Sequence, residues 1–130
     1  MGDYTVKRFD EMEPILGGVF RRARASLGAS AFGLQVLELP AGAEFYPNHD
    51  HTDDGQEEVY VVIGGSADFD IDGDRVHVEP DTAVRVAPAS KRQILPGAEG
   101  VRIIAIGAPS GGGYQAPAFT DLGGPEPSAG

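Results

Sequence analysis

Apolar residues in this chain occur in short runs separated by glycine and proline, a pattern typical of strands joined by turns. A first run contains Leu34, Val36 and Leu39 and ends at the turn residues 40–42. The run 59–63 is apolar at successive positions, which indicates a strand that is covered on both faces. We expect the second cover to be either an N-terminal arm or a partner subunit.

A β-hairpin is the clearest single element of the pattern. Residues 67–71 alternate between apolar and acidic side chains, and residues 76–78 alternate again after the dipeptide Asp72-Gly73. Asp-Gly is a preferred sequence for a tight type I′ turn, because both of its positions need a positive φ. Two further strands are predicted over residues 83–86 and 101–106.

The ends of the chain differ from this strand-rich part. Residues 1–30 are the least β-like and are predicted to form an irregular or short helical N-terminal arm. Residues 31–110 carry the strands and predict one all-β barrel or sandwich of the jelly-roll kind. Residues 111–130 are rich in glycine, proline and alanine, and they predict a C-terminal tail anchored by Tyr114 and Phe119.

Charge and composition narrow the function. The chain has 130 residues, no cysteine and a formal net charge of −10. Such a charge repels nucleic-acid phosphates and anionic lipid, so neither is expected as a partner. The absence of cysteine removes disulfides, thiolate metal sites and cysteine nucleophiles. Residues 1–10 lack the apolar segment of a secretory signal, so we expect a cytoplasmic protein.

The residues with the clearest chemistry are two histidines and a glutamate. His49 and His51 are alternate residues, and alternate side chains of an extended segment point the same way. Both imidazoles can therefore reach one metal ion, with Asp50 directed elsewhere. Glu58 opens the next apolar run and can supply a carboxylate to the same ion, while Glu57 points to the opposite side of that strand.

These residues also carry a family resemblance. Gly42, His49, His51, Glu58 and Gly65 resemble the first sequence motif of the cupins, and the resemblance runs from about residue 34 to residue 106. The form of the segment is similar to that of uncharacterised small single-domain cupins of bacteria. The resemblance implies a cupin jelly-roll β-barrel with a small-molecule pocket. It also implies a divalent metal, such as Fe, Mn, Ni or Zn, held by His49, His51 and Glu58.

This sequence departs from the cupin pattern at two places. Six residues separate His51 from Glu58, where the family usually has three or four, and the extra residues fall in the turn 52–55. The second cupin motif keeps its spacing but loses every signature residue, at positions Asp81, Ala87, Ala89, Arg92 and Pro96. Arg92 stands where the resemblance places a fourth ligand, a histidine. A guanidinium has no lone pair for a cation, so Arg92 is expected to pair with Glu58 or to bind a substrate carboxylate.

Two functional hypotheses stay open at this point. In the first, His49, His51 and Glu58 hold the metal of an oxygenase-, isomerase- or cyclase-type enzyme, and Arg92 orients an anionic substrate. In the second, the protein is a metal-free small-molecule-binding cupin in which Arg92 pairs with Glu58 or with a ligand carboxylate. Tyr60 shares the side of the strand on which Glu58 lies, so it either lines the pocket or fills the core. A homodimer is expected on either hypothesis, because the run 59–63 needs a second cover.

Overall fold

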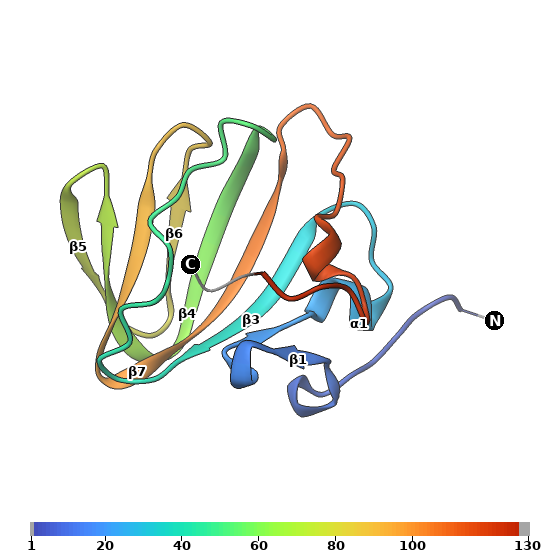
Figure 1. Cartoon of the computed structure of the whole chain (residues 1–130), viewed down its shortest axis with the longest axis horizontal. Helices are drawn as coiled ribbons and strands as arrows, with labels where there is room; N and C mark the ends of the chain where they lie inside the picture. The colour runs from blue at the N-terminus through green and yellow to red at the C-terminus, as the bar shows by residue number, and fades with distance from the viewer. Residues whose placement is uncertain (1, 128–130) are drawn as a thin grey trace.

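Seven strands form one antiparallel sheet that curls round on itself (Figure 1). They are seen in a computed structural model, which describes residues 2–127. The strands are β1 (Pro14–Ile15), β2 (Phe20–Arg21), β3 (Gly33–Leu39), β4 (Gln56–Ile71), β5 (Asp74–Val78), β6 (Thr82–Val86) and β7 (Arg92–Pro109). Their order in the sheet is β1-β2-β3-β7-β4-β5, and β6 pairs with the free side of β4. The prediction of an all-β jelly-roll fold is confirmed.

The two long strands, β4 and β7, connect the two halves of the sheet. The first half of β4 lies between β6 and the second half of β7. The second half of β4 lies between β5 and the first half of β7. The register shifts between Val62 and Gly64 and again between Gly65 and Ala67. These bulges bend both strands, and the bend brings the two halves face to face around a common core.

Glycine is required where the strands bend. Gly65 has a φ of +65°, and a Cβ at that position would lie 2.1 Å from the carbonyl oxygen of Gly100. Gly100 has a φ of +75°, and its Cβ would lie 2.7 Å from the carbonyl oxygen of Leu39. Three backbone segments therefore approach one another more closely than any side chain would allow. Gly65, which the resemblance assigned to the first motif, closes this corner of the fold.

The inner face of the sheet carries the core, and the alternation read from the sequence sets which residues lie there. Leu39, Tyr60, Phe69 and Ile103 are all buried, and they come from β3, β4 and β7. The turn between β4 and β5 has φ values of 52° at Asp72 and 90° at Gly73, as a type I′ turn requires. The hairpin and the strand at β3 are therefore confirmed.

The largest difference from the sequence pattern concerns β4 and β7. The pattern predicts separate strands over 59–63 and 67–71, but β4 runs through both without a break. The prediction of a last strand over 101–106 is too short, because β7 begins at Arg92. Pro96 and the buried polar residue Arg92 hide the first half of this strand from a reading based on apolar periodicity.

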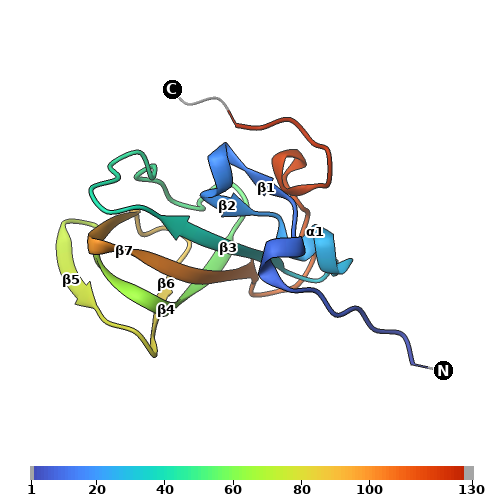
Figure 2. The ribbon, with the colours of Figure 1, turned by 90° about the horizontal axis from the view of Figure 1, so that it is seen from below.

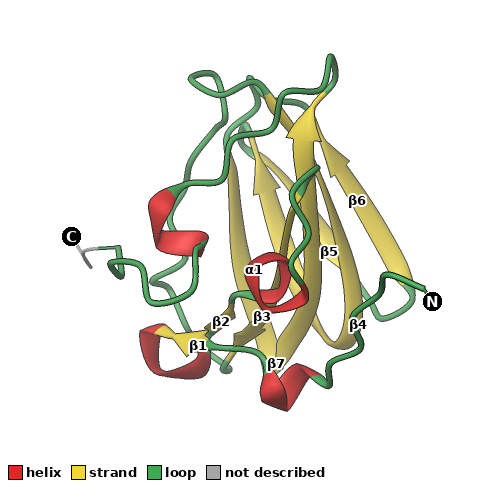
Figure 3. Cartoon of the chain, turned by 90° about the vertical axis from the view of Figure 1, so that its right-hand side faces the viewer, coloured by secondary structure: helices red, strands yellow, loops and turns green. Residues whose placement is uncertain are grey.

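The N-terminal arm contains more regular structure than the sequence suggests. The short strands β1 and β2 extend the sheet beyond β3, and they are followed by α1 (Ala23–Leu27). Single 3-10 turns occur at η1 (Phe9–Glu11) and η2 (Leu16–Gly18). All these helical segments lie on the β1–β3 side of the sheet (Figure 3). None of the helices between residues 2 and 127 is long and apolar enough to cross a membrane.

Two arginines of the arm hold the C-terminal segment. Arg22 donates to the carbonyl oxygens of Phe119 and Gly124 at 2.7 and 2.9 Å and pairs with Glu13. Arg24 lies 2.6 Å from a carboxylate oxygen of Asp121. The segment that contains η3 (Ala118–Thr120) therefore runs beside β1 and β2 (Figure 2).

The outer face of the sheet is only partly covered. The arm covers β3, where Met12 and Ala23 pack against Val36. Val59 and Val61 of β4 are half-buried on the same face, and Ile106 of β7 is exposed. The second cover expected for the run 59–63 is thus incomplete in a single chain.

Candidate metal centre

The loop between β3 and β4 carries both histidines, and backbone hydrogen bonds fix its course. His49 exchanges two backbone hydrogen bonds with Arg92, at 3.0 and 2.8 Å, and His51 N–H donates to the carbonyl oxygen of Pro88 at 2.8 Å. The loop is thereby held as an extended segment beside the start of β7. Alternate side chains of an extended segment point the same way, so both imidazoles face inward. Glu58 reaches them from β4.

The three side chains meet at one point. One ligand atom from each of His49, His51 and Glu58 lies within 4.8 Å of the other two. The imidazole rings of the two histidines are 5.1 Å apart and lie edge to face. We refer to these three residues as the His-His-Glu group. Two imidazoles and one carboxylate are a recurrent ligand set for divalent transition metals.

The outer nitrogen of each imidazole is already engaged by an oxygen. Nδ1 of His49 lies 2.9 Å from the carbonyl oxygen of Pro47, and because a carbonyl only accepts, Nδ1 carries the proton. Nδ1 of His51 lies 3.0 and 3.1 Å from the carboxylate oxygens of Asp54. In both residues Nε2 is the nitrogen left for an ion. This is the arrangement in which a second oxygen partner orients a metal-binding histidine.

The surroundings of the Nε2 atom of His51 indicate whether an ion fits the group. It lies 2.9 Å from Oε1 of Glu58, but the two atoms are not aligned for a hydrogen bond. Within residues 2–127 this buried nitrogen has no hydrogen-bond partner. Buried polar atoms without a partner are rare and costly, and a shared cation would satisfy nitrogen and carboxylate together. The residues present therefore fit a divalent metal.

Glu58 lies in a buried polar chain that keeps it ionised. Tyr60 donates to Oε1 of Glu58 at 2.6 Å, and the hydroxyl of Tyr46 lies 3.5 Å from that of Tyr60. Burial acts to raise the pKa of Glu58, but the neighbouring His51 and Tyr60 outweigh it, so the pKa is lowered. Conversely, the carboxylate of Glu58 is the main cause that raises the pKa of His51. Burial raises the pKa of both tyrosines, which keeps them as neutral hydrogen-bond donors.

Arg92 lies behind the His-His-Glu group and is fully buried. Its Nη2 donates to the carbonyl oxygen of Ala87 at 3.0 Å, and its Nε lies 4.0 Å from Oε1 of Glu58. Nε and Nη1 have no hydrogen-bond partner among residues 2–127. Arg92 thus forms a long ion pair with Glu58, as the sequence predicts, but it makes no hydrogen bond to that carboxylate.

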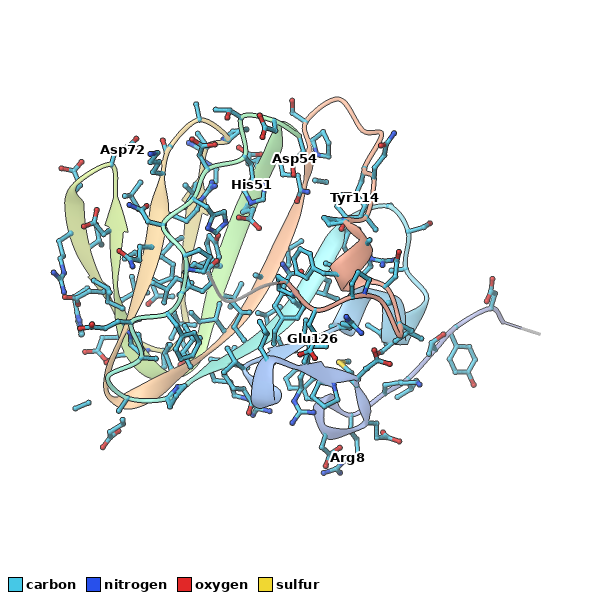
Figure 4. The ribbon with its side chains drawn as sticks, in the orientation of Figure 1. Arg8, His51, Asp54, Asp72, Tyr114 and Glu126 are labelled. Atoms are coloured by element: carbon cyan, nitrogen blue, oxygen red, sulfur yellow. The ribbon has the colours of Figure 1, made fainter. Side chains whose placement is uncertain are left out.

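A cavity of about 1100 Å³ opens in front of the group. His49, His51 and Glu58 all form part of its wall, whereas Arg92 and Tyr60 lie behind the wall. Figure 4 shows His51 and Asp54 together at the end of β4 where the strand begins, with Tyr114 of the C-terminal segment nearby. The substrate-binding role predicted for Arg92 and Tyr60 remains a prediction, and in this conformation neither side chain reaches the cavity.

The structure brings together the three side chains that the sequence suggests as ligands, but the sequence does not indicate the residues that orient them. Asp54 was assigned only to a turn, although its place three residues after His51 is a signal for a local His–Asp contact. Nothing in the sequence indicates that Tyr46 lies near the group, because its contact with His49, at 5.6 Å between ring centroids, depends on the fold. As expected, Glu57 points away from the group. It pairs with Arg85 at 2.7 Å.

Comparisons with known proteins agree with this architecture. Neither a family model nor a curated protein matches the sequence. Among solved structures, a cupin protein from Bacteroides fragilis superposes with a TM-score of 0.66 at 22% identity, over 93% of this chain and 96% of that one. A sugar phosphate isomerase from a cupin superfamily, from Silicibacter pomeroyi, gives 0.60 at 20% identity, over 70% of this chain and 59% of that one.

A third structure, the DMSP lyase DddQ from Ruegeria pomeroyi, has a TM-score of 0.55 at 23% identity, over 63% of this chain and 41% of that one. Sequence identities this low establish the fold alone. With the strand topology and the His-His-Glu group described above, they show that this chain is a small protein of the cupin fold.

Proposed function

We propose that this protein is a metal-dependent small-molecule enzyme in which His49, His51 and Glu58 hold one divalent ion. The observation that carries the proposal is the orientation of the two imidazoles. Each donates a hydrogen bond from Nδ1 to a fixed oxygen, from Pro47 in one case and Asp54 in the other. Each therefore keeps Nε2 for an ion in the His-His-Glu group, and His51, whose pKa is raised, gives up its second proton when the ion binds.

A three-ligand site leaves coordination positions free for substrate. An ion bound there would polarise a substrate oxygen or activate dioxygen, depending on the metal. The protein's own groups have separate tasks. Asp54 holds His51, Tyr60 holds Glu58, and the cavity gives a small molecule access to the open side of the group.

Neighbouring structures support an enzymatic use of this fold, since one is an isomerase and another a lyase. Those reactions belong to those proteins. For this chain we propose that the ion is Fe, Mn, Ni or Zn and that the reaction is of the oxygenase, isomerase or cyclase type.

The metal content of the purified protein tests the proposal. The protein is expressed without a histidine tag in medium supplemented with the four metals, and its metal content is measured beside that of His49→Gln with His51→Gln. We expect close to one ion per wild-type chain and almost none in the double variant. Equal metal contents in the two proteins would refute the site, as would wild-type protein that stays metal-free after reconstitution.

A metal-free small-molecule-binding cupin is the alternative, and one observation favours it. A protonated His51 lies between the carboxylates of Asp54 and Glu58 and would stabilise the group with no ion present. Arg92, 4.0 Å from Glu58, adds a second positive charge. If this alternative holds, added divalent ions leave the melting temperature unchanged, whereas the metal-dependent proposal requires an increase that His51→Gln abolishes.

We also propose that two copies pair through the outer face of the sheet. Val59 lies opposite Ile106 and Val61 lies opposite Ile104, so these four apolar residues form a block across β4 and β7. Ile106 remains 38% exposed in the single chain. Sedimentation at micromolar concentration should give twice the mass of one chain, and Ile106→Glu should return it to one. We separately propose the cytoplasmic location that the sequence leads us to expect.

A further inference from the structure

The cavity extends well beyond the His-His-Glu group. Its volume of about 1100 Å³ far exceeds the space needed by an ion and its water, and it matches that of a pocket for a medium-sized organic molecule. The wall is formed on one side by β3 and on another by the C-terminal segment, through Pro117 and Phe119. Most of a bound molecule would therefore lie away from the ion.

The wall of the cavity is largely apolar and rich in aromatic rings. Phe20, Phe45, Tyr46, Tyr114 and Phe119 all line the cavity. The rings of Phe20 and Phe119 lie 5.5 Å apart and join the arm to the C-terminal segment. Such a wall stabilises a ligand by burying apolar surface and offers few hydrogen bonds.

Apart from the histidines, the ionisable side chains that line the cavity are acidic, and most of them lie at the His-His-Glu end. Asp50, Asp53 and Asp54 belong to the loop that carries the histidines and Glu58 belongs to the group itself, so that Glu44 is the one wall carboxylate outside this end among residues 2–127. No lysine or arginine lies among the wall residues within the described chain, residues 2–127. An anionic group bound away from the ion would lose its water and gain no cation in return.

The nearby arginines are already occupied or enclosed. Arg22 and Arg24 hold the C-terminal segment through its carbonyl oxygens and Asp121. Arg92 lies behind Glu58 with no exposed surface. None of these guanidinium groups lines the cavity.

From this we infer that the substrate is an apolar small molecule with one polar group at the His-His-Glu end and no phosphate, sulfate or carboxylate at the other. This inference rests on the proposed function for the metal end, but its apolar part can be tested alone. A sugar phosphate bound by its sugar at the His-His-Glu end would place its phosphate against apolar and aromatic residues, with no lysine or arginine among the described wall residues, so it lies outside the class. This part of the wall gives an anion no cation in exchange for its water, while the aromatic rings bind an uncharged body.

A pair of fluorescent probes that share a naphthyl ring and differ in a phosphate group tests the inference. Binding of 2-naphthol and 2-naphthyl phosphate is measured by naphthyl fluorescence on chelator-treated protein, so that no ion attracts the phosphate. We expect 2-naphthol to bind at least about tenfold more tightly than 2-naphthyl phosphate. Equal affinities, or no binding of 2-naphthol, would overturn the inference.

Two variants assign the binding to this cavity. Gln35→Lys adds a cation to the wall and should raise the affinity for 2-naphthyl phosphate at least about fivefold. Thr82→Lys, at an exposed residue of β6 outside the wall, should not. If Gln35→Lys fails to fold, Phe45→Lys serves instead, since Phe45 is 57% exposed at the cavity edge. Val19→Phe should weaken 2-naphthol binding by filling space. No response of either probe to these changes would place the binding elsewhere and refute the inference.

These results separate the two proposals. Probe binding is measured without metal, so it can succeed when the metal content test fails. Conversely, a chain that binds one ion but prefers 2-naphthyl phosphate in its metal-free form keeps the metal site and loses the substrate class.

Discussion

The carboxylate of Asp54 lies 3.0 and 3.1 Å from Nδ1 of His51 and so directs the opposite ring nitrogen toward Glu58. This contact lies within one turn of the loop between β3 and β4. The same carboxylate accepts from the backbone and side-chain amides of Gln56, at 3.1 and 3.0 Å. The turn that begins β4 therefore also sets the orientation of His51.

Replacement of Asp54 should weaken metal binding without unfolding the chain. Oxygen partners of metal-binding histidines are typically worth about 10- to 100-fold in affinity, so Asp54→Ala should lose about that much. Asp54→Asn keeps one acceptor and should lose less. Calorimetric titration with a divalent ion measures both, and Asp53→Ala, in the same loop, serves as the control. If Asp54→Ala binds the ion as tightly as wild type, Asp54 does not orient His51.

The metal-free protein should show a stability that depends on pH through two groups. The pKa of His51 is raised above its ordinary 6.5, so its stabilising effect is complete below 6.5 and is lost as pH rises through the raised value. The pKa of Glu58 is lowered from 4.5, so its effect is present above 4.5 and is lost as pH falls through the lowered value.

Urea unfolding of chelator-treated protein between pH 3 and pH 9 measures this profile, and stability should be greatest near pH 5 to 6. His51→Gln should remove the loss on the alkaline side and also reduce the loss on the acid side, because His51 is the main neighbour that lowers the pKa of Glu58. An unchanged alkaline slope in that variant would show that another group is responsible.

Around the raised pKa of His51, metal affinity should change with pH in the direction opposite to the stability of the metal-free protein. An ion must displace the proton of His51, so affinity should fall as pH drops below the raised pKa of that residue. Titrations at pH 6 and pH 8.5 in buffers of different ionisation enthalpy give the number of protons released. Proton release close to zero at pH 6 would contradict the assignment of His51 as a ligand.

Arg92 should contribute to stability although two of its nitrogens have no partner. Arg92→Met removes the donor to Ala87 and the positive charge 4.0 Å from Glu58, and should cost about 1–3 kcal/mol of unfolding free energy. Arg85→Met breaks the exposed pair with Glu57 and should cost less than about 1 kcal/mol. If Arg92→Met is as stable as Arg85→Met, the buried guanidinium does not support Glu58.

The bend in β4 should depend on the absence of a Cβ at residue 65. Gly65→Ala would place a methyl group 2.1 Å from the carbonyl oxygen of Gly100, whereas Gly73→Ala has the same sign of φ but meets open space. Gly65→Ala should therefore lose at least about 2 kcal/mol more unfolding free energy than Gly73→Ala. Equal losses would mean that the two strands can separate at the bend at little cost.

The sequence predicts the elements whose pattern is local. The hairpin around Asp72-Gly73 follows from alternation and turn chemistry, and β3 follows from an apolar run that ends at Pro40. The meeting of His49, His51 and Glu58 follows from the alternate positions of the two histidines and from a carboxylate at the start of the next strand, although the spacing between His51 and Glu58 departs from that of the cupin motif. In each case the information lies within a few residues.

What the sequence does not predict depends on distant contacts. The short strands β1 and β2 exist because β3 offers them a partner edge. The first half of β7 is stabilised by β4 in spite of Pro96 and Arg92. No local pattern indicates that the guanidinium of Arg92 is enclosed, since that depends on Ala87 and Glu58 from other parts of the chain.

The central claim is that His49, His51 and Glu58 form one divalent metal site, and calorimetric titration of the untagged, metal-free protein tests it most directly. Mn²⁺ or Zn²⁺ should bind wild type at one ion per chain, while Glu58→Gln, which keeps the shape of the side chain, should lose at least about tenfold in affinity. Glu57→Gln, one residue away on the opposite face, should bind as wild type does. Absence of binding to wild type, or equal binding to Glu58→Gln, would contradict the account.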